Sequence, residues 1–93
     1  MPFKYNLSDE LKKTLKKLFK KDNKRYEAIL KKIEEVVSRD EKTIDFYKNL
    51  RNDMKDFKRV HIDKSFVLTF RVYRKENFVL FQRFRHHDQI YWA

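Results

Sequence analysis

The spacing of apolar residues changes from a helical to a strand period along the chain, and this change limits the fold more than any other feature. Before residue 38, apolar side chains recur every three or four residues, as they do on one face of a helix. After residue 56, aromatic and β-branched residues fill short segments that alternate in places. Helices followed by strands predict an α+β fold, in which the helices cover one face of a sheet.

Two amphipathic helices are expected in the first part of the chain. Ser8 is a residue type that caps helix N-termini, and the two carboxylates after it lie where the helix dipole favours anions. Leucines then recur at helical spacing, with lysines on the other side, until 20–23 breaks the pattern. A second apolar stripe covers about 24–38. Two short helices so close in sequence predict an antiparallel hairpin, preceded by a short strand at 3–6.

Three strands are expected later in the chain, over 57–62, 66–73 and 78–84. Turn-prone residues separate them, and short connections predict an antiparallel meander. The polar segment 39–55 is expected to form a loop with one helical turn at most. The order β-α-α-β-β-β therefore predicts one domain over residues 1–93, with a two-helix hairpin on a twisted, mainly antiparallel sheet.

Alternation along the strand 66–73 predicts which face of the sheet binds ligands. One set of side chains should meet the helices, namely Phe66, Leu68, Phe70 and Val72. The other set should point the opposite way, namely Val67, Thr69, Arg71 and Tyr73. We expect this second face to be the one available for binding.

The charge balance points to a polyanionic or acidic partner. Lysine and arginine total 24 against 14 acidic residues, which gives a net charge of +10. Nucleic acid, an acidic protein and a membrane surface all fit such a charge. The lysines over 12–21 fit either a solvated helix face or a contact with a polyanion. No apolar run has the length of a membrane helix, so a cytoplasmic protein without membrane attachment is expected.

Missing residue types exclude several kinds of site. The chain has no cysteine, which excludes disulfides, thiolate nucleophiles and cysteine-ligated metals. It has no glycine, which excludes the glycine-rich loops that hold nucleotide phosphates. The adjacent histidines 86 and 87 have no nearby cysteine or carboxylate cluster at a ligand spacing. We therefore expect neither a metal nor a cofactor.

Histidines on a basic surface suit RNA cleavage, although a strand histidine is more often a solvated residue. The three histidines are His61, His86 and His87. One imidazole can take the proton of a 2′-hydroxyl while another protonates the departing 5′-oxygen. Nearby cations would stabilise the negative charge on the phosphorane, and the candidates are Lys64, Arg83 and Arg85. Tyr91 could stack on a base or pack against the sheet edge.

The order of short motifs over 48–91 is more specific than any one of them. It comprises a Lys-x-Leu loop, a strand ending in Arg-Val-His-Ile, an aromatic-led strand, a turn, a further strand and a terminal His-x-x-x-Tyr. With the opening YNLSDELKKTLKKL, this order resembles the RelE/ParE superfamily of toxins over nearly the whole chain. The subgroup it is most similar to comprises the YafQ-like and RelE-like mRNA interferases, which implies a RelE-like fold.

The resemblance also implies site residues. His61 matches a catalytic histidine before the third strand, and His87 and Tyr91 match the terminal histidine and aromatic of the subgroup. Further polar active-site groups would lie at Asp63, Lys64 and Ser65.

This sequence departs from RelE itself near the third strand. Val67 stands where RelE-like members carry an arginine, and Val60 and Ile62 stand where RelE has paired lysines. The phosphate contacts we expect from Lys64, Arg83 and Arg85 are therefore our own assignments, not matches to the family.

The function implied by the resemblance is metal-independent cleavage of mRNA in the ribosomal A site. The 2′-hydroxyl would attack the adjacent phosphate, and translation would stop. An acidic, RelB-like antitoxin from the adjacent gene would block the toxin. Two alternatives stay open: ParE-type relatives poison DNA gyrase, and a basic module could bind RNA or the ribosome without catalysis.

Overall fold

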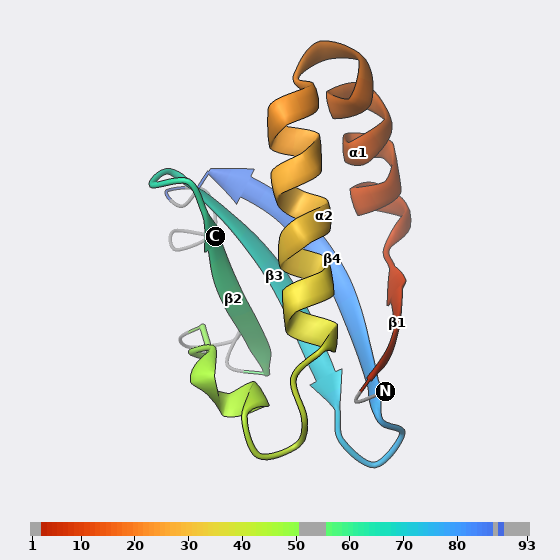
Figure 1. Ribbon diagram of the computed structural model, residues 1–93, viewed down its shortest axis with the longest axis vertical. Coiled ribbons are helices and arrows are strands. Elements are labelled where there is room, and N and C mark those ends of the chain that lie inside the picture. The colour runs from red at the N-terminus through yellow and green to blue at the C-terminus, as the bar shows by residue number, and fades with distance from the viewer. Residues whose placement is uncertain (1–2, 51–55, 87, 89–93) are drawn as a thin grey trace.

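The computed structural model describes residues 3–50, 56–86 and 88, and in it two helices cover one face of a four-stranded sheet (Figure 1). In chain order the elements are β1 (Lys4–Leu7), α1 (Asp9–Lys21), α2 (Asn23–Val37), the short 3-10 helix η1 (Ile44–Phe46), β2 (Phe57–Ile62), β3 (Phe66–Tyr73) and β4 (Phe78–His86). This order confirms the predicted β-α-α-β-β-β fold.

The strands lie in the order β1-β4-β3-β2, so the first and second strands of the sequence form opposite edges of the sheet. β1 is parallel to β4, whereas β2–β3 and β3–β4 are antiparallel. Between β1 and β2 the helix hairpin carries the chain across the sheet (Figure 1). The hairpin thus covers one face, and the opposite face of the sheet lies away from both helices.

Ser8 joins the start of α1 to the sheet. Its hydroxyl oxygen accepts a hydrogen bond from the backbone N–H of Leu11 at 3.1 Å, which confirms the predicted N-cap. The same hydroxyl donates to the carbonyl of Gln82, and the Ser8 N–H donates to the carbonyl of Phe81 at 2.9 Å. One side chain therefore fixes both the first turn of the helix and its position against β4.

The connection between the helices is shorter than predicted. The break expected over 20–23 is a single residue, Asp22, because α1 continues to Lys21 and α2 begins at Asn23. The Asp22 N–H donates to the carbonyl of Leu18 at 2.8 Å, and its carboxylate accepts from the Arg25 N–H at 3.2 Å. Asp22 thus ends one helix and begins the next.

The core lies between the hairpin and the sheet, around Phe70 and Phe81, whose ring centroids are 5.5 Å apart. A register shift between Thr69 and Phe70 leaves Gln82 as an extra residue on β4. Phe81 and Phe84 therefore both join the core although they are three residues apart. β4 also ends at His86, two residues later than predicted.

The face of the sheet away from the helices is only partly open. Val67 and Thr69, which we predicted to be available for binding, are fully buried. Val67 packs with Leu50 from the loop before β2 and with Phe57 at the start of that strand. The prediction was wrong for both positions, and at Val67 the reason is that Leu50 of the loop before β2 covers this part of the face.

A Ser8→Ala substitution should lower the free energy of unfolding by about 1–2 kcal/mol, since it removes the helix cap and the bond to β4. Chemical denaturation of the variant measures this loss. The control is Thr14→Ala, because the exposed Thr14 hydroxyl donates within its own helix to the Glu10 carbonyl. We expect that control to stay within about 0.5 kcal/mol of the wild type. Equal stability of the Ser8 variant would contradict the proposed junction.

Candidate functional site

His61 and both predicted phosphate-binding arginines, Arg83 and Arg85, lie on one face of the sheet, away from the helices. In the strand register His61 pairs with Val67, and Val67 pairs with Arg85, so these three residues form one row. Adjacent strands are about 4.8 Å apart, which puts the Cα atoms of His61 and Arg85 roughly 10 Å apart. Arg83 lies in the next row of the same face.

Arg59 was missed by the sequence analysis. It pairs with Thr69, and Thr69 pairs with Arg83, so Arg59 belongs to the second row. The signal was available, because residues two apart on a strand share a face and Arg59 precedes His61 by two. The two rows together place three arginines and a histidine on this face of the sheet.

Glu10 holds both arginines of β4. Its carboxylate lies 2.9 Å from Nη2 of Arg85 and 3.7 Å from Nε of Arg83. All three side chains are about two-fifths exposed, so the pairs are weak and accessible. A phosphate that binds Arg83 or Arg85 would compete with this carboxylate. From the sequence, Glu10 was expected to interact only with the helix dipole, and no local pattern predicted its contact with the arginines.

The turn between β2 and β3 carries three further predicted site residues, Asp63, Lys64 and Ser65. The Asp63 carboxylate lies 3.4 Å from Nη2 of Arg25, so it pairs with α2. Lys64 is exposed, and Ser65 is half-buried. The turn and the end of β4 lie at the same end of the sheet (Figure 1). Lys64 is therefore at the end of the sheet where His61 and Arg85 lie.

His86 lies on the opposite face from His61. Its ring meets the edge of Phe66 at a centroid distance of 5.6 Å, and Phe66 stacks on Phe84 at 5.0 Å. The Arg25 guanidinium covers the Phe66 ring at 4.3 Å. The predicted site residues His87 and Tyr91 fall outside the described residues.

A buried lysine fixes the loop beside β2. The Lys58 ammonium donates to the Tyr47 carbonyl at 3.0 Å and to Oδ1 of Asn49 at 2.9 Å, and it lies 3.1 Å from Oδ1 of Asp45. Asp45 also pairs with Arg74. Hydrogen bonds from Lys58 and then Arg74 hold the pKa of Asp45 below its usual range. The loop that the sequence predicted as irregular is therefore held at fixed points.

The same loop is tied to α2 through Tyr47. Its hydroxyl donates to the carboxylate of Glu35 and accepts from Nε of Arg39 at 3.3 Å. The hydrogen bond from Tyr47 is the main reason that the pKa of Glu35 is lowered, and Lys32, 3.1 Å away, adds to the effect. Burial is the main cause of the raised pKa of Tyr47.

A polar cleft of about 370 Å³ opens where this loop, α2 and β2 meet. It is lined by Lys32, Glu35, Phe46, Tyr47, Lys48, Arg59, Val60 and His61. The cleft lies at the β2 edge of the sheet, since β2 is the last strand in the strand order, and the loop pairs with this edge through a bridge between Asn49 and Lys58. His61 therefore borders both this cleft and the open face of the sheet.

The sequence profile of the family described as "ParE toxin of type II toxin-antitoxin system, parDE" matches residues 5–91. The chain belongs to the RelE/ParE toxin superfamily. It is 48% identical over 89 residues to a protein of Methanocaldococcus jannaschii described as "Putative toxin RelE4", covering 96% of this chain and 90% of that protein. It is also 40% identical over 85 residues to an uncharacterized protein of Methanosarcina mazei, covering 91% and 94% respectively.

A solved structure shows the same fold. The solution structure of a conserved hypothetical protein from Helicobacter pylori superimposes on the toxin with a TM-score of 0.57, at 22% identity, over 95% of this chain and 98% of that one. At this identity the likeness concerns the fold alone. As a member of a toxin–antitoxin family, the toxin has an antitoxin partner.

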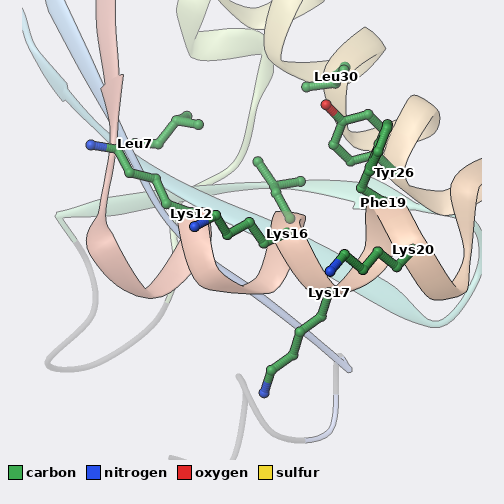
Figure 2. Close-up of a pocket in the computed structure, with 9 residues that line it drawn as sticks. Leu7, Lys12, Lys16, Lys17, Phe19, Lys20, Tyr26 and Leu30 are labelled. Atoms are coloured by element: carbon green, nitrogen blue, oxygen red, sulfur yellow. The ribbon is translucent and has the colours of Figure 1, made fainter.

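On the helix side, the toxin has an apolar groove of about 810 Å³. Its apolar lining comes from β1, α1 and α2, and four lysines of α1 lie along it (Figure 2). The full lining is Leu7, Lys12, Leu15, Lys16, Lys17, Phe19, Lys20, Tyr26 and Leu30. Phe19 is 58% exposed and meets the edge of the Tyr26 ring at 5.2 Å. An exposed phenylalanine that contacts a partly buried tyrosine beside lysines is unlike an ordinary solvated helix face.

Within residues 3–50, 56–86 and 88, no group of three or more histidine, aspartate or glutamate side chains is arranged to hold a metal ion. In the same described part of the chain, no helix has the length and apolar composition needed to cross a bilayer.

Replacing Tyr47 by phenylalanine should lower the free energy of unfolding near neutral pH, because the charged Glu35 loses a hydrogen-bond donor. The loss should be limited to about 1 kcal/mol, since Glu35 is partly exposed to water. The lowered pKa of Glu35 stabilises the fold above the usual value of 4.5, and this contribution is lost as the pH falls through the folded-state pKa. The difference between variant and wild type should therefore shrink in acid. Urea unfolding across this range tests it, with Tyr26→Phe as the control. A constant difference would exclude the Glu35 bond as its source.

Proposed function

We propose that this toxin is a metal-independent, ribosome-dependent mRNA endonuclease that stops translation. The observation that supports the proposal most directly is the row of His61, Val67 and Arg85 across three strands. It puts an exposed imidazole and a partly exposed guanidinium on the same face of the sheet, on either side of the buried Val67. The net charge of +10 favours approach to RNA.

The reaction is an attack of the 2′-hydroxyl on the adjacent phosphate. One of His61 and His87 takes the hydroxyl proton, and the other protonates the departing 5′-oxygen, since imidazoles exchange protons near neutral pH. The product is a cyclic phosphate or, after hydrolysis, a 3′-phosphate. Tyr91 positions the substrate.

The cations act on the charge that develops at the phosphorus. Arg83, Arg85 and Lys64 stabilise the negative phosphorane, which carries more charge than the ground-state phosphate. In the free toxin Glu10 occupies the two arginines. Substrate binding would exchange one carboxylate for a phosphate on arginines that are already ordered. Asp63 and Ser65 complete the polar surroundings in this proposal.

The cognate partner is an acidic, RelB-like antitoxin, and we propose that part of it binds in the groove of Figure 2. An amphipathic helix suits this groove, since its apolar residues would cover Phe19 and Tyr26. Acidic residues on its flanks would face the four lysines of α1.

Replacing either catalytic histidine should lower the rate of ribosome-dependent mRNA cleavage at least 100-fold, because general acid–base catalysis contributes about that much or more. The variants are His61→Ala, His87→Ala and Tyr91→Ala, assayed with purified ribosomes and a defined mRNA. His86→Ala is the matched control, since the His86 ring packs on the helix side against Phe66. Full cleavage by the double His61/His87 variant would remove this mechanism.

The second candidate function is poisoning of DNA gyrase, which is favoured by the match of residues 5–91 to the ParE profile. The assay above separates the two. Gyrase-dependent DNA damage during expression, with mRNA left intact, would support the ParE-type activity. Toxicity that survives loss of every candidate catalytic side chain, without damage to DNA, would instead support a basic module that binds the ribosome.

Truncating Phe19 should weaken antitoxin binding roughly 5-fold to 30-fold in Kd, as expected for an aromatic side chain that loses about 1–2 kcal/mol at an interface. The probe is the protein encoded by the acidic reading frame next to the toxin gene, titrated against the purified toxin by calorimetry. Phe46→Ala is the matched control, since Phe46 lies on the cleft and not in the groove. An unchanged Kd for Phe19→Ala would place the antitoxin elsewhere.

A further inference from the structure

The loop that carries Phe46 is anchored so that the side chain stays exposed to solvent. Its side chain is 70% exposed, more than any other large apolar side chain in the described part of the toxin. Ile44 and Tyr47, on either side of it, are buried, with exposed fractions of 0% and 4%, so the backbone on both sides is anchored in the core. The Lys58 bonds to Tyr47 and Asn49 add further fixed points. Core packing therefore does not explain why an aromatic ring stands here.

The ring of Phe46 is also oriented in advance. The Arg39 guanidinium lies over it at 4.6 Å from the centroid, and the Tyr47 ring meets it edge-on at 5.4 Å. Arg39 is itself tied to the Tyr47 hydroxyl at 3.3 Å. A ring supported in this way loses little freedom when a flat ligand stacks on it.

Beside this ring, the cleft is positively charged. Lys32, Lys48 and Arg59 line it together with a single carboxylate, that of Glu35. Glu35 already accepts the Tyr47 hydroxyl and pairs with Lys32, so its charge is compensated within the protein. The cleft thus offers a stacking surface next to cations, in a volume of about 370 Å³ that lies within the range of small-ligand sites.

We propose that this cleft binds one nucleotide of the RNA substrate, with its base stacked on Phe46 and its phosphate beside Lys48 and Arg59. The inference rests on the proposed nuclease function and extends it. Because His61 lines the same cleft, the strand would continue from the stacked nucleotide to the phosphate opposite Arg85. Phe46 is then a positioning residue that sets which phosphate meets the imidazole.

A base fits the cleft better than an acidic peptide does. Base stacking on an aromatic ring is tolerant of sequence and needs one flat, accessible surface beside a cationic track. A peptide helix needs a long apolar groove, and the toxin offers that on the helix side at Phe19. The two exposed phenylalanines therefore belong to different surfaces and make matched controls for each other.

The test measures RNA binding apart from cleavage. The probe is a short single-stranded RNA with 2′-O-methyl groups, which cannot undergo 2′-hydroxyl attack, and with one fluorescent 2-aminopurine base that reports stacking. The wild type is compared with Phe46→Ala, Phe46→Leu, Phe46→Trp and the control Phe19→Ala. Each variant is checked by thermal melting and for its affinity for the antitoxin.

Loss of the stacked base should weaken RNA binding about 5-fold to 100-fold in Phe46→Ala and abolish the stacking signal. Phe46→Leu should behave like the alanine variant, since it keeps apolar area but cannot stack. Phe46→Trp should restore both binding and signal, and Phe19→Ala should match the wild type. Cleavage of ribosome-bound mRNA by Phe46→Ala should move to a different phosphate or slow down.

Three results would overturn the inference. Wild-type binding and stacking signal in Phe46→Ala would show that the ring does not contact the RNA. Full activity of Phe46→Leu would show that stacking is not involved. Weaker antitoxin binding with unchanged RNA binding would assign the cleft to the protein partner. Failure of the proposed function is a separate outcome: the stacking signal would depend on Phe46 while the wild type leaves ribosomal mRNA intact.

Discussion

The need to cross the sheet from one edge to the other determines how this toxin is arranged. β1 pairs in parallel with β4 at one edge, and β2 forms the opposite edge, so the chain between them has to span the whole sheet. The α1–α2 hairpin makes this crossing and buries its apolar stripe on one face. Ser8 and Asp22 hold the two ends of α1 in place. The remaining face of the sheet carries His61 and the arginines, except where Leu50 covers Val67.

Carboxylates hold the basic residues of the toxin in defined positions. Glu10 reaches the two arginines of β4, Asp63 reaches Arg25, and Asp45 reaches Lys58. Such contacts contribute little stability where they are exposed, but they order long side chains before a ligand arrives. These basic side chains are therefore ordered in the free toxin, and phosphate groups could replace the carboxylates at a small cost in free energy. In our proposals the apolar groove binds the antitoxin and the polar cleft binds RNA.

Local sequence signals predicted most of the fold. The Ser8 cap, both amphipathic stripes and the three later strands have short-range causes, and each element was confirmed within about two residues. Features with long-range causes were missed. The burial of Val67 depends on Leu50, which lies 17 positions earlier, and the extra residue Gln82 arises from pairing with β3. In the candidate site, the alternation of β2 could have identified Arg59, whereas no local pattern indicates that Glu10 contacts Arg83 and Arg85.

The absence of glycine has a consequence for the unfolded chain. In residues 3–50, 56–86 and 88, two turn positions have a left-handed backbone, and they are occupied by Asp63 and Asn77, with φ angles of 61° and 52°. Short polar side chains tolerate this conformation, at some cost in strain compared with glycine. In return, a chain without glycine has fewer backbone conformations before it folds, and it gives up less entropy when it does. This smaller loss of entropy stabilises the fold of a molecule of 93 residues, whose core is small.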